Sequence, residues 1–299
     1  MNIRKKKICI IGIGKAGSAF ALELSDAGLN VKYIIDGDVK ILKALSKKIK
    51  GSQYFDHVNI ETISDSDIII LALRDDQLAE AAERICSAEI TFKNKTFIHL
   101  SGSLTSDVLK NKKFSSSDIA SFHPIQTFNK VSLKNNSLLN KIYFGIEGGK
   151  NASVILKKIA SMLGSKYIVI PSSKKYIYHI ASVFASNYLV VLADIVSELS
   201  GNVSGKKASS FELFEPIIIN TLRNIKESGS VKALTGPVAR NDIELVSRHL
   251  AALKKDKKEF LQAYSVLGKA AAELAFKKGS IKKIDKTKFN KLFDQFLHP

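Results

Sequence analysis

The chain has 299 residues, of which 45% are hydrophobic and 25% charged, and its formal net charge is +18. This length and apolar content allow a sizeable core and two domains, so we expect a globular protein rather than a disordered chain. The two cysteines, Cys9 and Cys86, fit neither a disulfide framework nor a metal site, and we predict no bound metal.

The positive charge does not by itself indicate a nucleic-acid partner. Lysines occur as pairs in almost every predicted helix, as at Lys157-Lys158 and Lys282-Lys283, without interleaved aromatic residues that could stack on bases. We interpret them as solvated helix faces and predict no nucleic-acid binding, although a field of this sign would attract anionic substrates.

The hydropathy pattern predicts that the protein does not span a membrane. We find no apolar run of the roughly 18 residues that a membrane span needs, and no signal-peptide cleavage pattern before the first strand. We therefore expect a cytoplasmic protein without membrane contact.

The first predicted unit is a strand, a glycine turn and a helix. Residues 8–11 form a continuous apolar run, as expected for a parallel strand covered on both faces. The turn that follows reads Gly12-Ile13-Gly14-Lys15-Ala16-Gly17. Gly12 permits the tight turn, Gly14 lets backbone N–H groups approach phosphate oxygens, and Gly17 lets the helix pack against the strand. The pattern predicts a pyrophosphate site; the alternative is a glycine turn that binds no nucleotide.

A second strand is predicted over residues 31–35 and ends at Asp36, about 20 residues after the glycine turn, as in dinucleotide-binding folds. The Asp36 carboxylate would accept the hydroxyls of the adenosine ribose and repel a 2′-phosphate, which favours NAD. Lys15 and Lys40 could offset this repulsion. The predicted cofactor is therefore NAD or NADP.

Strand and helix patterns alternate up to residue 171. The apolar patterns predict strands at 67–73, 96–100, 119–122, 143–147 and 167–170, and helices at 39–49, 77–87 and 152–163. This alternation predicts an α/β fold with an open, mostly parallel, doubly wound sheet, in a dinucleotide-binding Rossmann domain over residues 1–171.

Several polar residues follow these strands directly, where open α/β sheets place ligands. Arg74 follows one strand after Leu73, Ser101 follows the next, and His123 follows a third. Pro124 alone could explain a stiff turn after His123.

After Pro171 the strand signals end. Helical patterns at 173–200, 209–227, 242–253, 257–277 and 287–297 predict an all-helical domain over residues 172–299.

The stretch 173–200 is apolar almost all the way round, which predicts a helix buried on every side. Lys175, His179, Ser182 and Ser186 recur at intervals that place them in one polar stripe, while Asn187 lies about 100° away. Such a stripe indicates either core side chains satisfied by internal hydrogen bonds or a wet cleft. His179 is the candidate acid/base, since imidazole exchanges protons near neutral pH.

A further polar motif covers residues 235–242. Asn241 and Glu244 form an N-cap pair, which accounts for both structurally. Capping does not explain Arg240, whose guanidinium could bind a substrate carboxylate or phosphate but could equally be a surface arginine.

Taken together, these motifs resemble a family of Rossmann-fold NAD(P)-dependent oxidoreductases with a C-terminal helical domain of unknown function. The matching segments are 12–17, 99–102, 121–124, 178–187, 234–242 and 249–250. The wider superfamily looks like pyrroline-5-carboxylate reductase, prephenate dehydrogenase and the β-hydroxyacid dehydrogenases, whose helical domains pair into dimers and close the active cleft. The resemblance implies a homodimer formed through the helical domain.

Some residue roles follow only from this resemblance. His123-Pro124 is similar to a His-Pro element of prephenate dehydrogenases. In β-hydroxyacid dehydrogenases a helix carries a catalytic lysine followed by asparagines, and Lys175 and Asn187 are the nearest equivalents here. The spacing is longer, and His179 stands between them, so the identity of the proton donor is open.

The leading hypothesis is an NAD(P)-dependent oxidoreductase that moves hydride between nicotinamide and a small carbonyl, hydroxy or imine substrate in an interdomain cleft. In this hypothesis residues 12–17 bind pyrophosphate, and the nicotinamide half is flanked by Leu73, Arg74 and Ser101. His179 is the acid/base and Ser186 and Asn187 hold the substrate atom, with Lys175 as a further catalytic candidate. His123 and Arg240 bind substrate. The alternative is a non-catalytic dinucleotide-sensing regulatory module.

Overall fold

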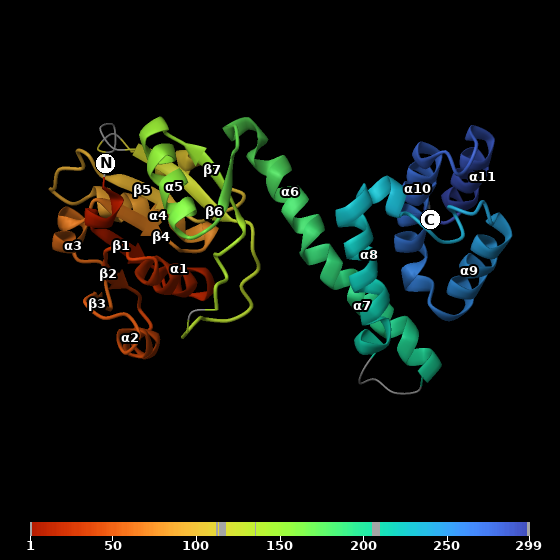
Figure 1. The fold of residues 1–299 in the computed structure, drawn as a ribbon, viewed down its shortest axis with the longest axis horizontal. Helices are drawn as coiled ribbons and strands as arrows, with labels where there is room; N and C mark the ends of the chain where they lie inside the picture. Colours follow the sequence, from red (N-terminus) through yellow and green to blue (C-terminus); the bar gives the residue numbers. More distant parts are fainter. Residues whose placement is uncertain (1, 112, 114–117, 135, 205–209, 298–299) are drawn as a thin grey trace. The chain divides into compact units, whose positions relative to one another are not determined.

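The computed structural model describes residues 2–111, 113, 118–134, 136–204 and 210–297 (Figure 1). The chain divides into two compact units, Met1–Asn187 and Tyr188–Pro299. Each has its own hydrophobic core. The division lies beyond the boundary predicted at residue 171, because helix α6 (Lys175–Ala185) counts with the first unit.

An eight-stranded sheet forms the centre of the first unit, with strand order β3-β2-β1-β4-β5-β6-β7-β8. Neighbouring strands are parallel except for the antiparallel pair β6 and β7. The strands are β1 (Ile8–Ile11), β2 (Val31–Ile35), β3 (Gln53–Phe55), β4 (Ile68–Leu71), β5 (Thr96–His99), β6 (Asp118–Pro124), β7 (Tyr143–Gly148) and β8 (Lys166–Val169). The predicted mostly parallel, doubly wound α/β fold is confirmed. The short strand β3 has too weak an apolar pattern to be predicted.

Helices cover both faces of this sheet, as Figure 1 shows. They are α1 (Lys15–Asp26), α2 (Val39–Ser46), α3 (Ile60–Asp65), α4 (Asp75–Cys86) and α5 (Lys150–Met162). Ile8 and Ile10 of β1 contribute to a core shared with α1, α2 and α5, whereas Cys9 and Ile11 contribute to a core shared with α3 and α4. Successive strand residues point to opposite faces, so an unbroken apolar strand requires cover on both sides.

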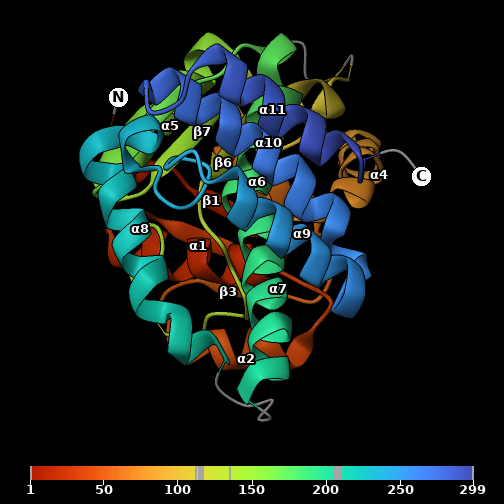
Figure 2. The same cartoon turned by 90° about the vertical axis from the view of Figure 1, so that its right-hand side faces the viewer.

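The second unit is helical in the described residues. Its helices are α7 (Asn187–Ser204, whose first residue still belongs to the first unit), α8 (Ser210–Ala233), α9 (Ile243–Asp256), α10 (Leu261–Lys278) and α11 (Lys283–Asp294). Figure 2 shows α9, α10 and α11 grouped together, and their buried side chains, such as Leu250, Ala272 and Phe293, form one core. Ser209, where the second helix of this region was predicted to begin, lies outside the described residues.

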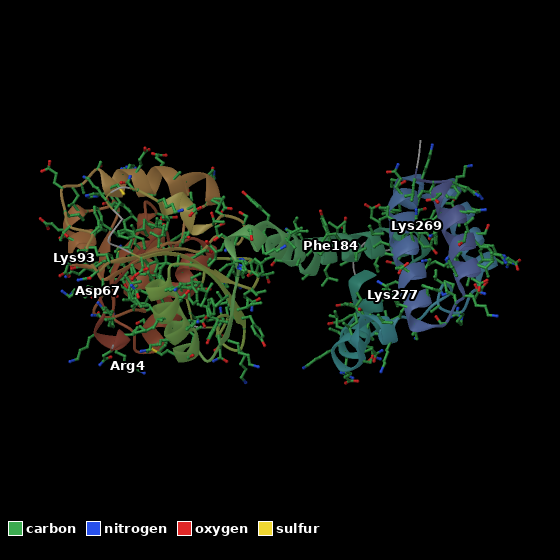
Figure 3. All side chains as sticks on the ribbon, turned by 90° about the horizontal axis from the view of Figure 1, so that it is seen from above. Arg4, Asp67, Lys93, Phe184, Lys269 and Lys277 are labelled. Atoms are coloured by element: carbon green, nitrogen blue, oxygen red, sulfur yellow. The ribbon has the colours of Figure 1, made fainter. Side chains whose placement is uncertain are left out.

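The prediction for residues 173–200 was wrong in two respects. Ser186, with φ −126° and ψ −70°, interrupts the helix and separates α6 from α7. The helix is also not buried on every side, because Lys175 is buried whereas Tyr176 and Phe184, the latter labelled in Figure 3, are 66% and 64% exposed. In α6 Lys175 and His179 of the polar stripe face the sheet and the cavity beside it, whereas apolar side chains such as Ile177 and Phe184 are exposed.

The segment Ser172–Gly201 also corrects the expectation about membrane spans. By length and composition it could cross a membrane, with 30 residues, a mean hydropathy of 1.7 and none of its apolar window buried. Composition alone does not say what covers such a surface.

Candidate coenzyme and active site

The glycine turn after β1 has the geometry that its sequence predicts. Gly12 has φ +91°, and a Cβ there would lie 2.6 Å from the carbonyl oxygen of Ala72. A Cβ on Gly17 would lie 2.0 Å from the carbonyl oxygen of Gly12, so α1 can approach β1 only at a glycine. A Cβ on Gly14 would meet nothing within 4 Å. Gly12 and Gly17 therefore form the turn, and Gly14 leaves an open space beside it.

This open space lies at the N-terminus of α1. Gly14 is the N-cap residue, it supplies no side-chain hydrogen bond, and the first turn contains no acidic residue. The first backbone N–H groups of a helix have no partner within the helix, and the helix dipole favours negative charge there. The arrangement fits a pyrophosphate, as the sequence predicts.

Asp36 is engaged with the backbone around this turn. One carboxylate oxygen accepts a hydrogen bond from the Ile13 N–H at 2.7 Å, and the other accepts one from the Asp38 N–H at 2.7 Å. Asp36 thus holds the end of β2 against the glycine turn. Ribose binding by this carboxylate stays a prediction.

Two cavities lie beside the carboxyl ends of the central strands. One, of about 510 Å³, is largely apolar and is lined by Ile11, Val58, Ile60, Ile63, Leu73, Gln77, Glu80, Ala81, Arg84, Ile85, Ser87 and Ala88. The other, of about 270 Å³, is lined by Ala16, Ala72, Leu73, Asp75, Leu100, Ser101, Gly102, His123, Pro124, Gln126, Phe128 and His179. Leu73 lines both. The two cavities are therefore adjacent spaces separated by the end of β4.

The smaller cavity, hereafter the histidine cavity, brings together residues from distant parts of the chain. His123 lies near the end of β6 and His179 comes from α6, with their ring centroids 6.4 Å apart. Both rings lie against Gly102, where a Cβ would be 2.8 Å from His123 Nε2 and 2.9 Å from His179 Nδ1. His179 Nδ1 is buried and has no hydrogen-bond partner among the described residues. A bound ligand or water could supply the missing partner.

Lys175 lies behind this cavity rather than in its wall. Its side chain is fully buried, and Nζ donates a hydrogen bond to Ser121 Oγ at 2.5 Å, while Ser121 Oγ donates to the Ser101 carbonyl at 2.9 Å. Desolvation lowers the pKa of Lys175 to about 8, partly opposed by the nearby carboxylates of Glu147 and Asp75. At neutral pH Lys175 is thus a cation whose pKa lies only slightly above the pH.

The histidines near Lys175 are held neutral. Burial, and then the charge of Lys175, lower the pKa values of His99 and His123 to about 4. His99 accepts a hydrogen bond at Nδ1 from the Ser101 N–H at 3.2 Å, and its Nε2 lies 3.2 Å from the Thr105 carbonyl. His99 therefore fixes the loop after β5.

Other predicted site residues lie elsewhere. The Arg74 side chain is 75% exposed and pairs with Asp76. Ser186 and Asn187, at the junction of α6 and α7, are absent from the lining of the histidine cavity. Arg240, in the second unit, is exposed on the turn before α9. The binding roles predicted for these residues stay predictions.

One further polar residue of the first unit received no role in the sequence analysis. Tyr178 Oη lies 2.6 Å from His123 Nδ1, and a Cβ on Gly145 would lie 2.6 Å from the same hydroxyl. Tyr178 occurs in one of the motifs that carry the family resemblance, which is the only sequence signal that singles it out. Among the described residues no group of three or more His, Cys, Asp and Glu could hold a metal ion.

Two family models match the chain. Residues 7–101 match the model described as NADP oxidoreductase coenzyme F420-dependent, and residues 142–271 match a domain of unknown function (DUF2520). The DUF2520 match begins near the start of β7, so it covers part of the sheet as well as the helices that follow.

Solved structures resemble the chain over most of its length. A protein of Bacteroides fragilis, named as a candidate NADP oxidoreductase, is 24% identical with a TM-score of 0.71, over 91% of this chain and 100% of that one. A protein of Thermotoga maritima is 26% identical with a TM-score of 0.71, over 91% of this chain and 99% of that one. Pyrroline carboxylate reductase of Plasmodium falciparum, solved with NADP bound, is 16% identical with a TM-score of 0.57, over 98% of this chain and 100% of that one.

The description of the matching family model names NADP, which agrees with the predicted cofactor class, NAD or NADP. Residues 7–101 thus match an NADP oxidoreductase domain and residues 142–271 match a DUF2520 domain, which is the combination that the motifs predict.

Proposed function

We propose that this protein is an NAD(P)-dependent oxidoreductase that transfers a hydride between nicotinamide and a small carbonyl, hydroxy or imine substrate. One observation carries the proposal: a glycine turn with an uncapped helix N-terminus lies beside the histidine cavity, and Ala16 belongs to both. A pyrophosphate bound at that turn would direct one half of a dinucleotide into this cavity.

The larger apolar cavity, lined by Ile11, Ile63 and Leu73, has the chemistry of a purine site, with Gln77 and Arg84 at its polar side. We assign the adenine to it and the nicotinamide to the histidine cavity. A bound nicotinamide supplies or accepts the hydride. The residues of the chain orient both reactants and handle the proton.

In this proposal His179 is the acid/base. Its Nδ1 is buried without a partner beside Gly102, so the ring has an unused proton site next to the cavity. His123 contacts the substrate. Lys175 is sealed from the cavity and acts through its charge and its bond to Ser121.

Two observations point to different coenzymes. The Asp36 carboxylate near the ribose position favours NAD by repelling a 2′-phosphate, whereas the matching family model is described as an NADP oxidoreductase. We propose NAD as the preferred coenzyme. Separate titrations with NADH and NADPH that give equal or tighter NADPH affinity would contradict this preference.

We predict that His179→Ala lowers kcat by about 10²–10⁴-fold, the usual contribution of a positioned acid or base. Coenzyme affinity should stay within two-fold or so, since the glycine turn is untouched. The measurement is NAD(P)H absorbance with carbonyl, hydroxy and imine substrates, beside coenzyme titration of both proteins. Ser182→Ala is the matched control, because Ser182 Oγ only bonds back to the Tyr178 carbonyl.

An unchanged pH profile and full turnover in His179→Ala would rule out the acid/base role. Tight coenzyme binding without turnover of any substrate, together with a coenzyme-dependent change in assembly, would favour the alternative of a dinucleotide sensor. A wild-type protein that binds neither NADH nor NADPH would contradict both the oxidoreductase and the sensor function.

We also propose a cytoplasmic homodimer formed through the helical region. The support is the apolar outer surface of the helices, with Ile177 66%, Val190 68% and Leu213 66% exposed in the single chain. Single exposed apolar residues are ordinary, but runs of them, along α6 in the first unit and along α7 and α8 in the second, indicate surfaces that are covered. We propose a second copy of the chain as the cover.

Light scattering is expected to give twice the 32.8 kDa of one chain. Val190→Asp should shift the mass toward the monomer, because a buried unpaired carboxylate is costly. Asp194→Ala, at an exposed polar position of the same helix, is the control and should leave the mass unchanged. If the wild-type protein were a monomer that binds to lipid vesicles, the dimer proposal would be wrong and the apolar surface would be a membrane contact.

A further inference from the structure

The ring of His123 is held in one orientation by residues far apart in the chain. Tyr178 Oη lies 2.6 Å from His123 Nδ1, and the two rings are almost perpendicular, at 88°. The tyrosine hydroxyl fits there because β7 has a glycine at position 145, where a Cβ would be 2.6 Å from Oη. The other side of the imidazole lies against Gly102, which also lacks a Cβ.

The direction of the hydrogen bond follows from the partners available. Among the described residues, the Tyr178 hydroxyl has one hydrogen-bond partner, His123 Nδ1. If His123 donated instead, the tyrosine hydrogen would be left without an acceptor in a half-buried site, which costs free energy. Burial also raises the pKa of Tyr178, which keeps the hydroxyl protonated. The hydroxyl therefore donates and Nδ1 accepts.

His123 then carries its single hydrogen on Nε2. The groups that face the ring are Lys175, His179 and Tyr178 of α6, Asp75 of α4 and His99 of β5. Desolvation and the charge of Lys175 lower the pKa of His123 to about 4, so the imidazole is neutral at neutral pH. A neutral imidazole has one donor and one acceptor, and the acceptor is already occupied.

The free donor lies at the histidine cavity. Nε2 is 2.8 Å from the position of a Cβ on Gly102, and Gly102 and His123 both line the cavity. No hydrogen bond to His123 Nε2 occurs among the described residues. His123 thus presents its Nε2–H group to the cavity in a fixed position.

We propose that Tyr178 is a positioning residue that fixes His123 as the Nε2–H tautomer, and that the site is built for a carbonyl substrate or its alcohol rather than an iminium. This inference rests on the proposed oxidoreductase function. A carbonyl or hydroxyl oxygen accepts the Nε2–H bond. A protonated imine carries its own N–H, which would oppose that of His123. His123 therefore polarises the oxygen as a neutral donor, while proton exchange falls to another group.

The tautomer is measured on coenzyme-free protein with ¹⁵N-labelled histidine, from the ring nitrogen shifts between about pH 5.5 and 8.5. The His123 signals are identified by their loss in His123→Gln. We expect a protonated Nε2 and an unprotonated Nδ1 throughout this range. In Tyr178→Phe the two tautomers should mix. Tyr176→Phe, at an exposed position two residues earlier, should leave the signals unchanged.

The functional arm compares ketone reduction with imine reduction. Tyr178→Phe should lower kcat/KM for the ketone about ten-fold, equivalent to about 1.4 kcal/mol, and leave coenzyme affinity unchanged. A wild-type His123 protonated at Nδ1, or a Tyr178→Phe protein with the wild-type tautomer, would overturn the positioning role. Imine reduction as fast as ketone reduction would overturn the substrate class. Because the tautomer is read without coenzyme, its outcome is independent of whether the protein proves to be an oxidoreductase.

Discussion

Gly14→Ala is expected to keep the fold and lose coenzyme affinity by at least about ten-fold, or about 1.4 kcal/mol. A Cβ at this position meets nothing within 4 Å, so the protein itself has room for the methyl group. The methyl group would instead occupy the space through which phosphate oxygens approach the first N–H groups of α1. Titration with NADH and NADPH measures the loss, and thermal unfolding checks the fold.

Gly17→Ala should act differently, because its Cβ would lie 2.0 Å from the Gly12 carbonyl oxygen. Here α1 must move away from β1, so we expect both a lower melting temperature and weaker coenzyme binding. Gly201→Ala is the control, since a Cβ at Gly201 in α7 also meets nothing within 4 Å. If Gly14→Ala bound both coenzymes as tightly as the wild type, the pyrophosphate assignment would be wrong.

Lys175→Met is expected to stabilise the protein at pH 7 by about 2 kcal/mol. Lowering the pKa of a fully buried lysine from 10.5 to about 8 corresponds to about 3 kcal/mol of destabilisation at neutral pH. Methionine has a similar length without the charge. The lost hydrogen bond to Ser121 offsets about 1 kcal/mol of the gain. Urea unfolding at pH 7 gives the free energy of unfolding of each protein.

The same substitution should change how stability depends on pH. Between about pH 8 and pH 10.5 the unfolded chain keeps the Lys175 proton while the folded protein has lost it. The unfolded state then binds more protons, so wild-type stability gains a rising contribution over this window, and the penalty is fully present below pH 8. Lys175→Met should lack that contribution.

Lys174→Met is the matched control, since Lys174 is exposed and should change stability by less than about 0.5 kcal/mol. A Lys175→Met protein less stable than the wild type at pH 7 would contradict the assignment of Lys175 as a buried cation that destabilises the folded protein. The substitution should also raise the pKa of His123, because the lysine charge helps to lower it. Lys175 lowers the stability of the protein and helps to keep His123 neutral. We therefore interpret it as a functional residue rather than a structural one.

The parts of this fold that the sequence predicts are those set by local chemistry. The turn between β1 and α1 depends on Gly12, whose φ of +91° favours glycine, and on Gly17, which lies against the carbonyl of Gly12 in the same turn. The central strands, such as β1 and β4, are predicted because each is a short apolar run that needs cover on both faces. The N-terminal side of the site follows from these two features.

The histidine cavity depends instead on contacts between distant residues. His123 and Tyr178 are brought together by the packing of α6 beside the sheet, and Gly102 and Gly145 matter only because of the rings that lie against them. No local pattern states such a pairing. The burial predicted for residues 173–200 failed for a related reason, because apolar composition does not specify which surface will cover a helix.

The orientation of α6 has a consequence for how quaternary association could influence chemistry. One side of this helix carries His179 toward the histidine cavity, and the next residue, Ile180, about 100° further round the helix, is 49% exposed. A rigid helix transmits a small rotation from one side to the other. Formation of the proposed dimer at the outer side would thus shift the imidazole of His179. Activity would then depend on protein concentration even at saturating coenzyme.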